Sequence, residues 1–438
     1  MNCLRALAFL SLLLAAPAMA AERYAPEKTT CDGWPRAPIG MAPGFCAGLV
    51  VVPPAAFASR QVRLPRLMLP LPGGDWLVTD LGGWNIRRGA VWRLHAEKGQ
   101  AARLTPLLAW LNMPHGLARG PDGKTYVGEM SRIFRFDHEA ADPAKTIQTV
   151  VDGLPDNRLH ENRHPLSYFI FDGDGALLVN VGALSDQCVA KDGKPKGETT
   201  CTESEGAEKT AGVRRYTYRG NGIWAKDFTM LARGLRNSLA LVRHASGTLL
   251  QAENSIDFRN PDSPFEELNL LRSGAHYGWP YCYDMDKPAP AWAGAKAMDC
   301  RSSAHEKPVR LLPPHASPLG MAYYQGAMFP ELAGRLLMSW HGYEAAGARL
   351  VAFDVDTKGI PLPAPRARYA FYDGRGGSGS KPYPGPAAEP LTITPLWDER
   401  KALRPMGTPV GMAVAADGAI WMTEDKNATI LRVARDRP

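Results

Sequence analysis

The chain has 438 residues, of which 51 are Lys or Arg and 44 are Asp or Glu, so that its formal net charge is +7. The basic residues are dispersed and form no run of five or six, which argues against a nucleic-acid-binding protein. The 43 Gly and 38 Pro residues suit a chain with many turns and disfavour a helical protein.

Residues 1–20 have the pattern of a secretory signal peptide. Arg5 gives a positive start, an apolar stretch follows, and Ala18-Met19-Ala20 offers small residues for cleavage. No later stretch approaches about 18 apolar residues, so no membrane span is expected. The sequence therefore predicts a periplasmic or secreted protein.

Six cysteines follow this segment in three sequence-local pairs: Cys31 and Cys46, Cys188 and Cys201, and Cys282 and Cys300. Six cysteines allow many connectivities. Pairing of nearest neighbours is favoured because each pair brackets a loop rich in Gly, Lys and Pro. No CxxC spacing or cluster of His indicates a metal site. Disulfides agree with an oxidising compartment.

We expect residues 21–60 to form an N-terminal extension with one disulfide, and residues 61–438 to carry a repeat. One phrase recurs six times there: an apolar run, a turn marked by Gly or Asp-Gly, a second apolar run and a polar or acidic residue. The copies are 65–80, 116–130, 168–182, 238–254, 320–342 and 411–425. Each has the pattern of a β-hairpin.

The spacing of the copies, roughly 50 to 80 residues, is close to that of propeller blades. A hairpin cannot bury both of its faces, whereas sheets arranged radially can. Segments between the copies alternate apolar and polar residues, as outer strands do. The sequence thus predicts an all-β fold, a six-bladed β-propeller of four-stranded antiparallel blades.

Several residues near the ends of the copies carry groups with useful chemistry. His164 lies just ahead of the third copy and has a side chain suited to general base catalysis. Arg236 and Asn237 open the fourth copy and could hold an anionic planar ligand. The loop 253–257 after the second strand of that copy is rich in oxygen and could bind Ca²⁺. Taken singly, these groups are better interpreted as a surface His, a turn Asn with Arg in water, and an ordinary acidic turn.

His315 and His341 flank the fifth copy, so we expect them at the same end of the central channel. The sequence has no GxSxG or Walker A motif. It also lacks CxxCH, so no c-type haem is expected.

The segments GLRNSLAL (234–241), EELNLLRSGAHYGWPYCYD (266–284), PPHASPLGMAYYQGAMFPE (313–331) and SWHGY (339–343) resemble the PQQ-dependent soluble sugar dehydrogenase family, in particular its sorbosone and aldose dehydrogenase branch. The resemblance covers roughly residues 65–435. It implies a six-bladed propeller that holds pyrroloquinoline quinone (PQQ) with Ca²⁺.

By position, the resemblance implies a role for each of these groups. His164 matches the general base that takes the proton of the sugar hydroxyl while hydride passes to the quinone. Arg236 and Asn237 match the groups that polarise the quinone oxygen and hold a carboxylate. The carbonyls of Ser255 and Ile256 match the Ca²⁺ ligands.

His341 falls where some members place a Lys on a PQQ carboxylate, and we count His315 among the cofactor-binding residues. The glucose-oxidising members have two arginines before the last Asp-Gly, where this chain has Gly407 and Pro409. Arg404 is the nearest cation: either it takes the place of these arginines as a cofactor-binding residue, or PQQ is held differently, or the protein does not bind PQQ.

The sequence therefore predicts a periplasmic PQQ-dependent oxidoreductase that oxidises a sugar or aldehyde and passes electrons to a separate acceptor. One alternative is a non-catalytic propeller that binds glycans or a protein. Another is a Ca²⁺-dependent lactonase-like hydrolase, for which the strand ends offer Asp80, Glu129, Glu253 and Asp425.

Overall fold

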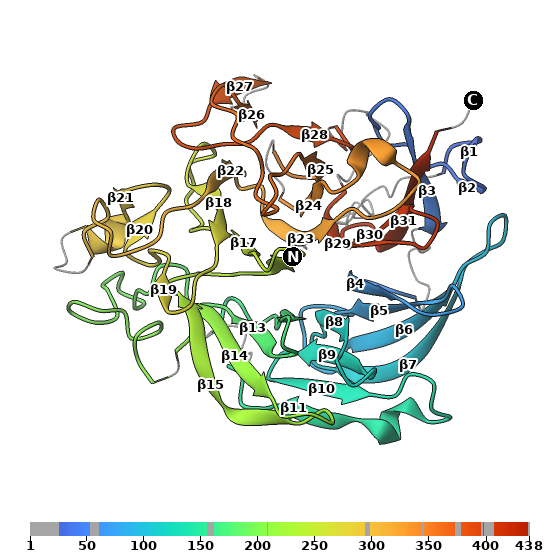
Figure 1. Cartoon of the computed structure of the whole chain (residues 1–438), viewed down its shortest axis with the longest axis horizontal. Coiled ribbons are helices and arrows are strands. Elements are labelled where there is room, and N and C mark those ends of the chain that lie inside the picture. The colour runs from blue at the N-terminus through green and yellow to red at the C-terminus, as the bar shows by residue number, and fades with distance from the viewer. Residues whose placement is uncertain are drawn as a thin grey trace, which may run out of the picture.

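The structure, a computed structural model, describes residues 26–52, 61–155, 162–207, 209–293, 298–342, 346–372, 378–395, 397 and 407–436. Six sheets are arranged around a common axis, and the chain passes from blade to blade around the ring in sequence order (Figure 1). Helical structure in these residues is limited to three short 3-10 turns, η1 (Pro143–Thr146), η2 (Pro290–Trp292) and η3 (Pro330–Leu332). The predicted all-β, six-bladed propeller is confirmed.

Every copy of the predicted phrase forms the two inner strands of a blade. These are β4 (Pro65–Pro70) with β5 (Trp76–Asp80), β8 (Gly116–Arg119) with β9 (Thr125–Glu129), β12 (Phe169–Phe171) with β13 (Leu177–Val181), β16 (Ala240–Arg243) with β17 (Leu249–Glu253), β23 (Pro318–Tyr323) with β24 (Leu336–Trp340), and β29 (Pro409–Val414) with β30 (Ile420–Glu424). Gly123, Gly175 and Gly418 turn their hairpins at φ of 77°, 80° and 85°, a conformation that favours glycine.

Two outer strands complete each blade. The third strands are β6 (Gly89–His95), β10 (Arg132–Phe136), β14 (Gly212–Tyr218), β18 (Phe265–Leu270), β25 (Arg349–Phe353) and β31 (Thr429–Arg435). The fourth are β7 (Arg103–Leu111), β11 (Gln148–Val151), β15 (Trp224–Arg233), β22 (Arg310–Pro314), β28 (Pro390–Thr392) and β3 (Phe45–Val51). The short β19 (Ala275–His276) adds a parallel strand beside β15.

The ring is closed by β3, which pairs antiparallel with β31 near the other end of the chain. β3 comes from the segment 21–60, so the boundary expected at residue 60 divides the sixth blade. The pairing has a clear physical reason, because without β3 the strand β31 would present unpaired backbone groups at an open edge. The small sheet of β1 (Thr30–Cys31) and β2 (Trp34–Pro35) is joined to β3 by the disulfide between Cys31 and Cys46.

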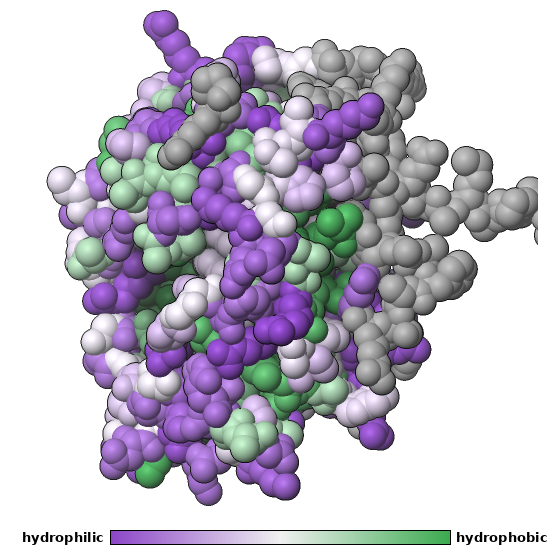
Figure 2. All heavy atoms as spheres, turned by 90° about the vertical axis from the view of Figure 1, so that its right-hand side faces the viewer, coloured by the Kyte–Doolittle hydropathy of each residue, from purple (hydrophilic) through white to green (hydrophobic). Residues whose placement is uncertain are grey.

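Apolar side chains fill the spaces between neighbouring blades. Trp421 of the sixth blade stacks on Trp76 of the first, with ring centroids 4.7 Å apart. Phe45 of β3 stacks on Phe329 at the same distance. The side that carries β3, β6 and β7 is largely hydrophilic, and its exposed hydrophobic residues form small separate groups (Figure 2). The sheets thus bury their apolar faces against one another.

All three predicted disulfides are present. Cys188–Cys201 and Cys282–Cys300 lie in one apolar cluster with Trp279 and Trp292, which packs two long insertions against each other. The insertions contain β20 (Cys282–Tyr283) and β21 (Lys287–Pro288), and a hairpin of β26 (Arg368–Tyr372) and β27 (Ser378–Pro382) projects from the fifth blade. None of the helices in the described part of the chain has the length and apolar character needed to cross a membrane.

Buried acids at the ends of the second strands fix the loops on one face of the ring. The Asp80 carboxylate accepts the backbone N–H of Leu64 at 2.8 Å, and Glu253 accepts that of Asn237 at 3.1 Å. Glu424 accepts the N–H of Thr408 at 2.8 Å. Each acid therefore holds the segment that leads into the first strand of its own blade.

Candidate active site

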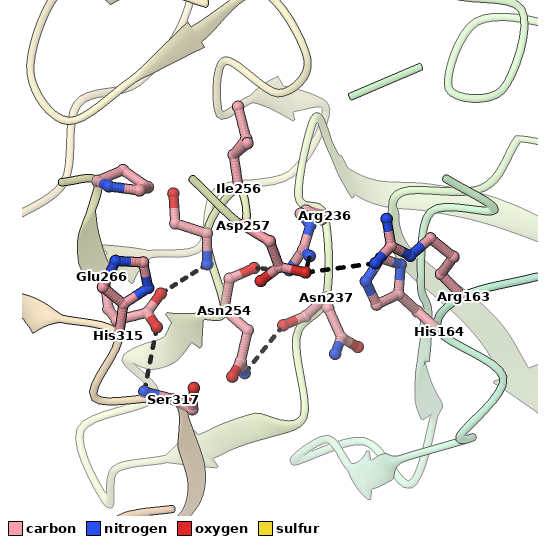
Figure 3. Close-up of a pocket in the computed structure, with 12 residues that line it drawn as sticks. Arg163, His164, Arg236, Asn237, Asn254, Ile256, Asp257, Glu266, His315 and Ser317 are labelled. Carbon is pink, nitrogen blue, oxygen red and sulfur yellow. Dashed lines mark hydrogen bonds and ion pairs between the residues drawn. The ribbon is translucent and has the colours of Figure 1, made fainter. Parts of the chain in front are cut away.

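A polar pocket of about 230 Å³ opens on this face, between the third, fourth and fifth blades. The loops ahead of β12, β16 and β23 and the loop after β17 form its walls (Figure 3). Six of the residues predicted from the sequence line it together: His164, Arg236, Asn237, Ser255, Ile256 and His315. They meet because the same ends of neighbouring blade strands converge around the ring.

The His164 ring is held in one orientation by the loop after β13. Its Nδ1–H donates to the carbonyl of Ala183 over 2.6 Å, which leaves Nε2 as a proton acceptor. Burial lowers the pKa of His164 well below its usual value, and the charges of Arg236 and Arg163 lower it further. The imidazole is therefore neutral near pH 7.

The Arg236 guanidinium is buried, and both of its terminal nitrogens are bonded. Its Nη1–H donates to the carbonyl of Asn254 at 2.9 Å, and its Nη2 lies 2.8 Å from Asp186 Oδ1 and 2.7 Å from Asp257 Oδ2. Its Nε is buried and has no hydrogen-bond partner among the residues that the structure describes. A buried donor of this kind is costly unless a ligand satisfies it.

The neighbouring Asn237 has a second unsatisfied group. Its backbone N–H is bonded to Glu253, and its carbonyl accepts the N–H of Asn254 at 3.2 Å, so the residue is fixed. Its side-chain oxygen is also buried, and no described residue bonds to it. Both residues line the pocket, where a guanidinium beside an amide fits a polar, anionic ligand, while the two unsatisfied atoms are themselves buried.

Glu266 joins the two loops that carry Ser255 and Ser317. Its carboxylate accepts the backbone N–H of Ser255 at 2.6 Å and that of Ser317 at 3.0 Å (Figure 3). Burial raises the pKa of Glu266 to about 7.

The predicted Ca²⁺ ligand Ile256 has a hydrogen bond of its own, because its carbonyl accepts the N–H of Phe258 at 3.0 Å. In the described residues, no group of three or more His, Cys, Asp or Glu side chains is arranged to hold a metal ion.

The other expected cofactor residues divide into three cases. His315 lines the pocket and its Nε2–H donates to the carbonyl of Asn260 at 2.8 Å. His341 is not among the residues that line it: its ring pairs with Asp425 over 3.0 Å, and its backbone N–H donates to the carbonyl of Ser317 at 3.0 Å. Arg404 lies outside the described residues.

The positions of the family's late arginines are occupied by tightly packed small residues. A Cβ at Gly407 would lie 2.3 Å from the Trp397 ring, so a larger residue cannot be accommodated there. Pro409 begins β29. The nearby Asp425 is paired with Arg66 and bonded to Thr408, whose hydroxyl donates over 2.7 Å. The cation beside this strand end is thus Arg66 of the first blade.

The structure adds residues that were not predicted from the sequence: Arg163 and Glu266, which line the pocket, and Asp186, which bonds to Arg236. Arg163 and Glu266 stand next to predicted positions, beside His164 and inside the EELN segment, and that proximity was the available signal. Asp186 lies in the insertion 184–210, which has no regular pattern. Only the folded insertion shows that its carboxylate reaches Arg236.

Fold and pocket together define a six-bladed propeller with a polar pocket on one face of its ring, lined by two arginines and two carboxylates. The family model of the glucose / sorbosone dehydrogenases matches residues 119–358, just over half of the 438 residues. The chain belongs to this family. An uncharacterized protein of Borreliella burgdorferi is 26% identical over 256 residues, which are 54% of this chain and 60% of that protein. The match therefore spans less than two thirds of that relative.

Solved structures share the fold at low identity. A Trichoderma reesei enzyme of carbohydrate-active family AA12 has a TM-score of 0.68 at 18% identity, over 94% of this chain and all of that one (100%). The holo form of the PQQ domain of pyranose dehydrogenase from Coprinopsis cinerea has a TM-score of 0.61 at 17% identity, over 93% and 100%. The PQQ-bound aldose sugar dehydrogenase of Streptomyces coelicolor has a TM-score of 0.54 at 19% identity, over 90% and 100%.

Proposed function

We propose that this protein is an exported dehydrogenase that oxidises a sugar or aldehyde with PQQ as its cofactor and Ca²⁺ as its metal, and passes the electrons to a separate acceptor. Membership of the glucose / sorbosone dehydrogenase family supports the reaction class. PQQ is named for two of the proteins that share the fold. The three disulfides agree with an oxidising compartment.

The pocket residues suit this cofactor. PQQ carries three carboxylates and two quinone oxygens, so it needs cations and hydrogen-bond donors. Arg236 and Arg163 supply positive charge, and Asn237 supplies an amide beside them. The carbonyls of Ser255 and Ile256 are our candidates for Ca²⁺ ligands, since Ca²⁺ prefers oxygen. When bound, PQQ would accept a hydride from the substrate carbon, with Ca²⁺ as Lewis acid.

His164 would then take the proton of the substrate hydroxyl at Nε2. The hydrogen bond from Nδ1 to Ala183 fixes the tautomer with a free lone pair at Nε2, and the lowered pKa keeps that lone pair available. Removal of the hydroxyl proton raises the tendency of the carbon to release hydride. This neutral, oriented His164 beside Arg236 and Asn237 is the observation on which the proposal rests.

Reconstitution tests the proposal. PQQ and Ca²⁺ are added to the purified protein, and reduction of a redox dye is followed with a panel of aldoses and aldehydes. We expect dye reduction that needs substrate, PQQ and Ca²⁺ together, and that EDTA abolishes. Absence of both PQQ binding and dye reduction would leave a non-catalytic binding propeller as the better account.

The lactonase-like alternative has less support. It requires a central cage of acids, but Asp80 and Glu253 are bonded to backbone N–H groups of their own blades. Glu129 is paired with Arg132, and Asp425 with His341 and Arg66. These carboxylates hold the fold together instead of converging on a common centre.

A further inference from the structure

The two carboxylates on Arg236 differ in how firmly they are held. The Asp186 side chain is 11% exposed, whereas that of Asp257 is 62% exposed, and Arg236 between them is 4% exposed. A buried guanidinium needs at least one counter-ion, because an unpaired buried charge is strongly destabilising. One of the two carboxylates can therefore be spared, and the exposures indicate which.

Asp186 is anchored on several sides. Its Oδ1 accepts the backbone N–H of Asp257 at 3.0 Å in addition to Arg236, and its carbonyl accepts the indole N–H of Trp279 at 2.9 Å. The next carbonyl, of Gln187, accepts the indole N–H of Trp292 at 2.9 Å. The Cys188–Cys201 disulfide begins one residue further on. Asp186 is thus built into the packed insertion.

Asp257 has the opposite character. Its carboxylate lies between two guanidiniums on the pocket wall, 2.7 Å from Arg236 Nη2 and 3.8 Å from Arg163 Nη2 (Figure 3). These two arginines are the only side chains of the described residues that bind it. A rotation about its side-chain bonds would return it to water at little cost in desolvation, and would uncover both cations.

We propose that Asp257 fills a carboxylate subsite between Arg163 and Arg236, which a carboxylate of the bound ligand takes over, while Asp186 stays in place and positions Arg236. The exchange replaces one carboxylate by another, so the charge beside Arg236 is conserved. It also keeps the guanidinium paired at every stage. The inference rests on the proposed function for the identity of the ligand, PQQ.

The test compares the same substitution on the two acids. PQQ binding to Asp257→Asn and Asp186→Asn is measured by isothermal titration calorimetry at fixed Ca²⁺, without substrate. Loss of the competing carboxylate should lower the Kd of Asp257→Asn about tenfold, since charge-assisted hydrogen bonds are of that strength. Loss of the anchor should raise the Kd of Asp186→Asn by a similar factor. Asp174→Asn removes an exposed carboxylate paired with Arg215 and should change nothing.

A second probe separates this inference from the proposed function. Benzene-1,3,5-tricarboxylate carries three carboxylates on a planar ring but no quinone. If the unsubstituted protein fails to bind PQQ, the proposed function is contradicted, and this probe decides the subsite in the same variants. An Asp257→Asn protein that binds both compounds no more tightly than the unsubstituted protein, or binds neither, would overturn the subsite. Because the Asp257 side chain is exposed, we expect the Asp257→Asn protein to fold like the unsubstituted one.

Discussion

The neutral state of His164 follows from its surroundings more than from its own chemistry. Burial disfavours the imidazolium, and Arg236 and Arg163 add positive charge nearby. The Ala183 carbonyl acts in the opposite direction but is outweighed. A base that remains unprotonated in mildly acidic solution is what a proton acceptor on an alcohol requires.

This environment predicts the pH dependence of the reaction. Because the pKa of His164 is lowered, the acid limb of kcat/KM should lie below pH 6.5, and activity should persist where a free histidine would be protonated. Arg163→Gln removes one of the charges that lower the pKa, so its acid limb should move to higher pH. The pH profile and an NMR titration of the His164 ring would measure both. An acid limb above that of a free histidine would contradict the assignment.

The sequence signals for the site were of two kinds. His164, Arg236, Asn237 and His315 could be predicted because they stand at the ends of recognisable hairpins, and strand ends meet at the mouth of a ring. His341 also stands at a strand end, but its ring pairs with Asp425 of the next blade. The orientation of a side chain at such a strand end depends on contacts with the neighbouring blade, so the local sequence does not predict it.

At the scale of the strand, β3 carries the closure of the ring. Phe45 is 4% exposed and stacks on Phe329, while Phe45 and its neighbours pair along β31. Residues about 385 positions apart thus form the last sheet, and no periodic pattern links them. Closure was accordingly the part of the fold that the sequence analysis did not assign.

Replacement of Phe45 by Ala should destabilise the protein by about 3–5 kcal/mol, the usual cost of a large cavity between buried side chains. Chemical denaturation would measure it. Val52→Ala, just beyond β3 where the side chain is 44% exposed, is the matched control and should cost less than about 0.5 kcal/mol. Equal costs for the two variants would show that β3 is not part of the stable ring.

In β18, the third strand of the fourth blade, the sequence pattern does not predict which side chains are buried. Its sequence FEELNL looks water-facing, yet Glu266 and Glu267 are 4% and 6% exposed. Glu266 is buried because it bonds the loops of Ser255 and Ser317, which form two walls of the pocket. Here a functional constraint replaces the apolar alternation by which strands are recognised.

For the whole molecule, the ring geometry brings together groups that no single blade could supply. His164 comes with the third blade, Arg236 and Asn237 with the fourth, and His315 with the loop into the fifth. The disulfide-bonded insertions add Asp186 from outside the blades. The central claim is that this assembly binds PQQ and that His164 removes the substrate proton.

A single-turnover experiment tests that claim most directly. The protein is loaded with PQQ and Ca²⁺, mixed rapidly with an aldose or aldehyde, and the absorbance of the bound cofactor is followed. We predict that PQQ is reduced in the unsubstituted protein, and that His164→Asn binds PQQ with an unchanged Kd but reduces it about 10²–10⁴-fold more slowly. Equal reduction rates in the two proteins would contradict the account.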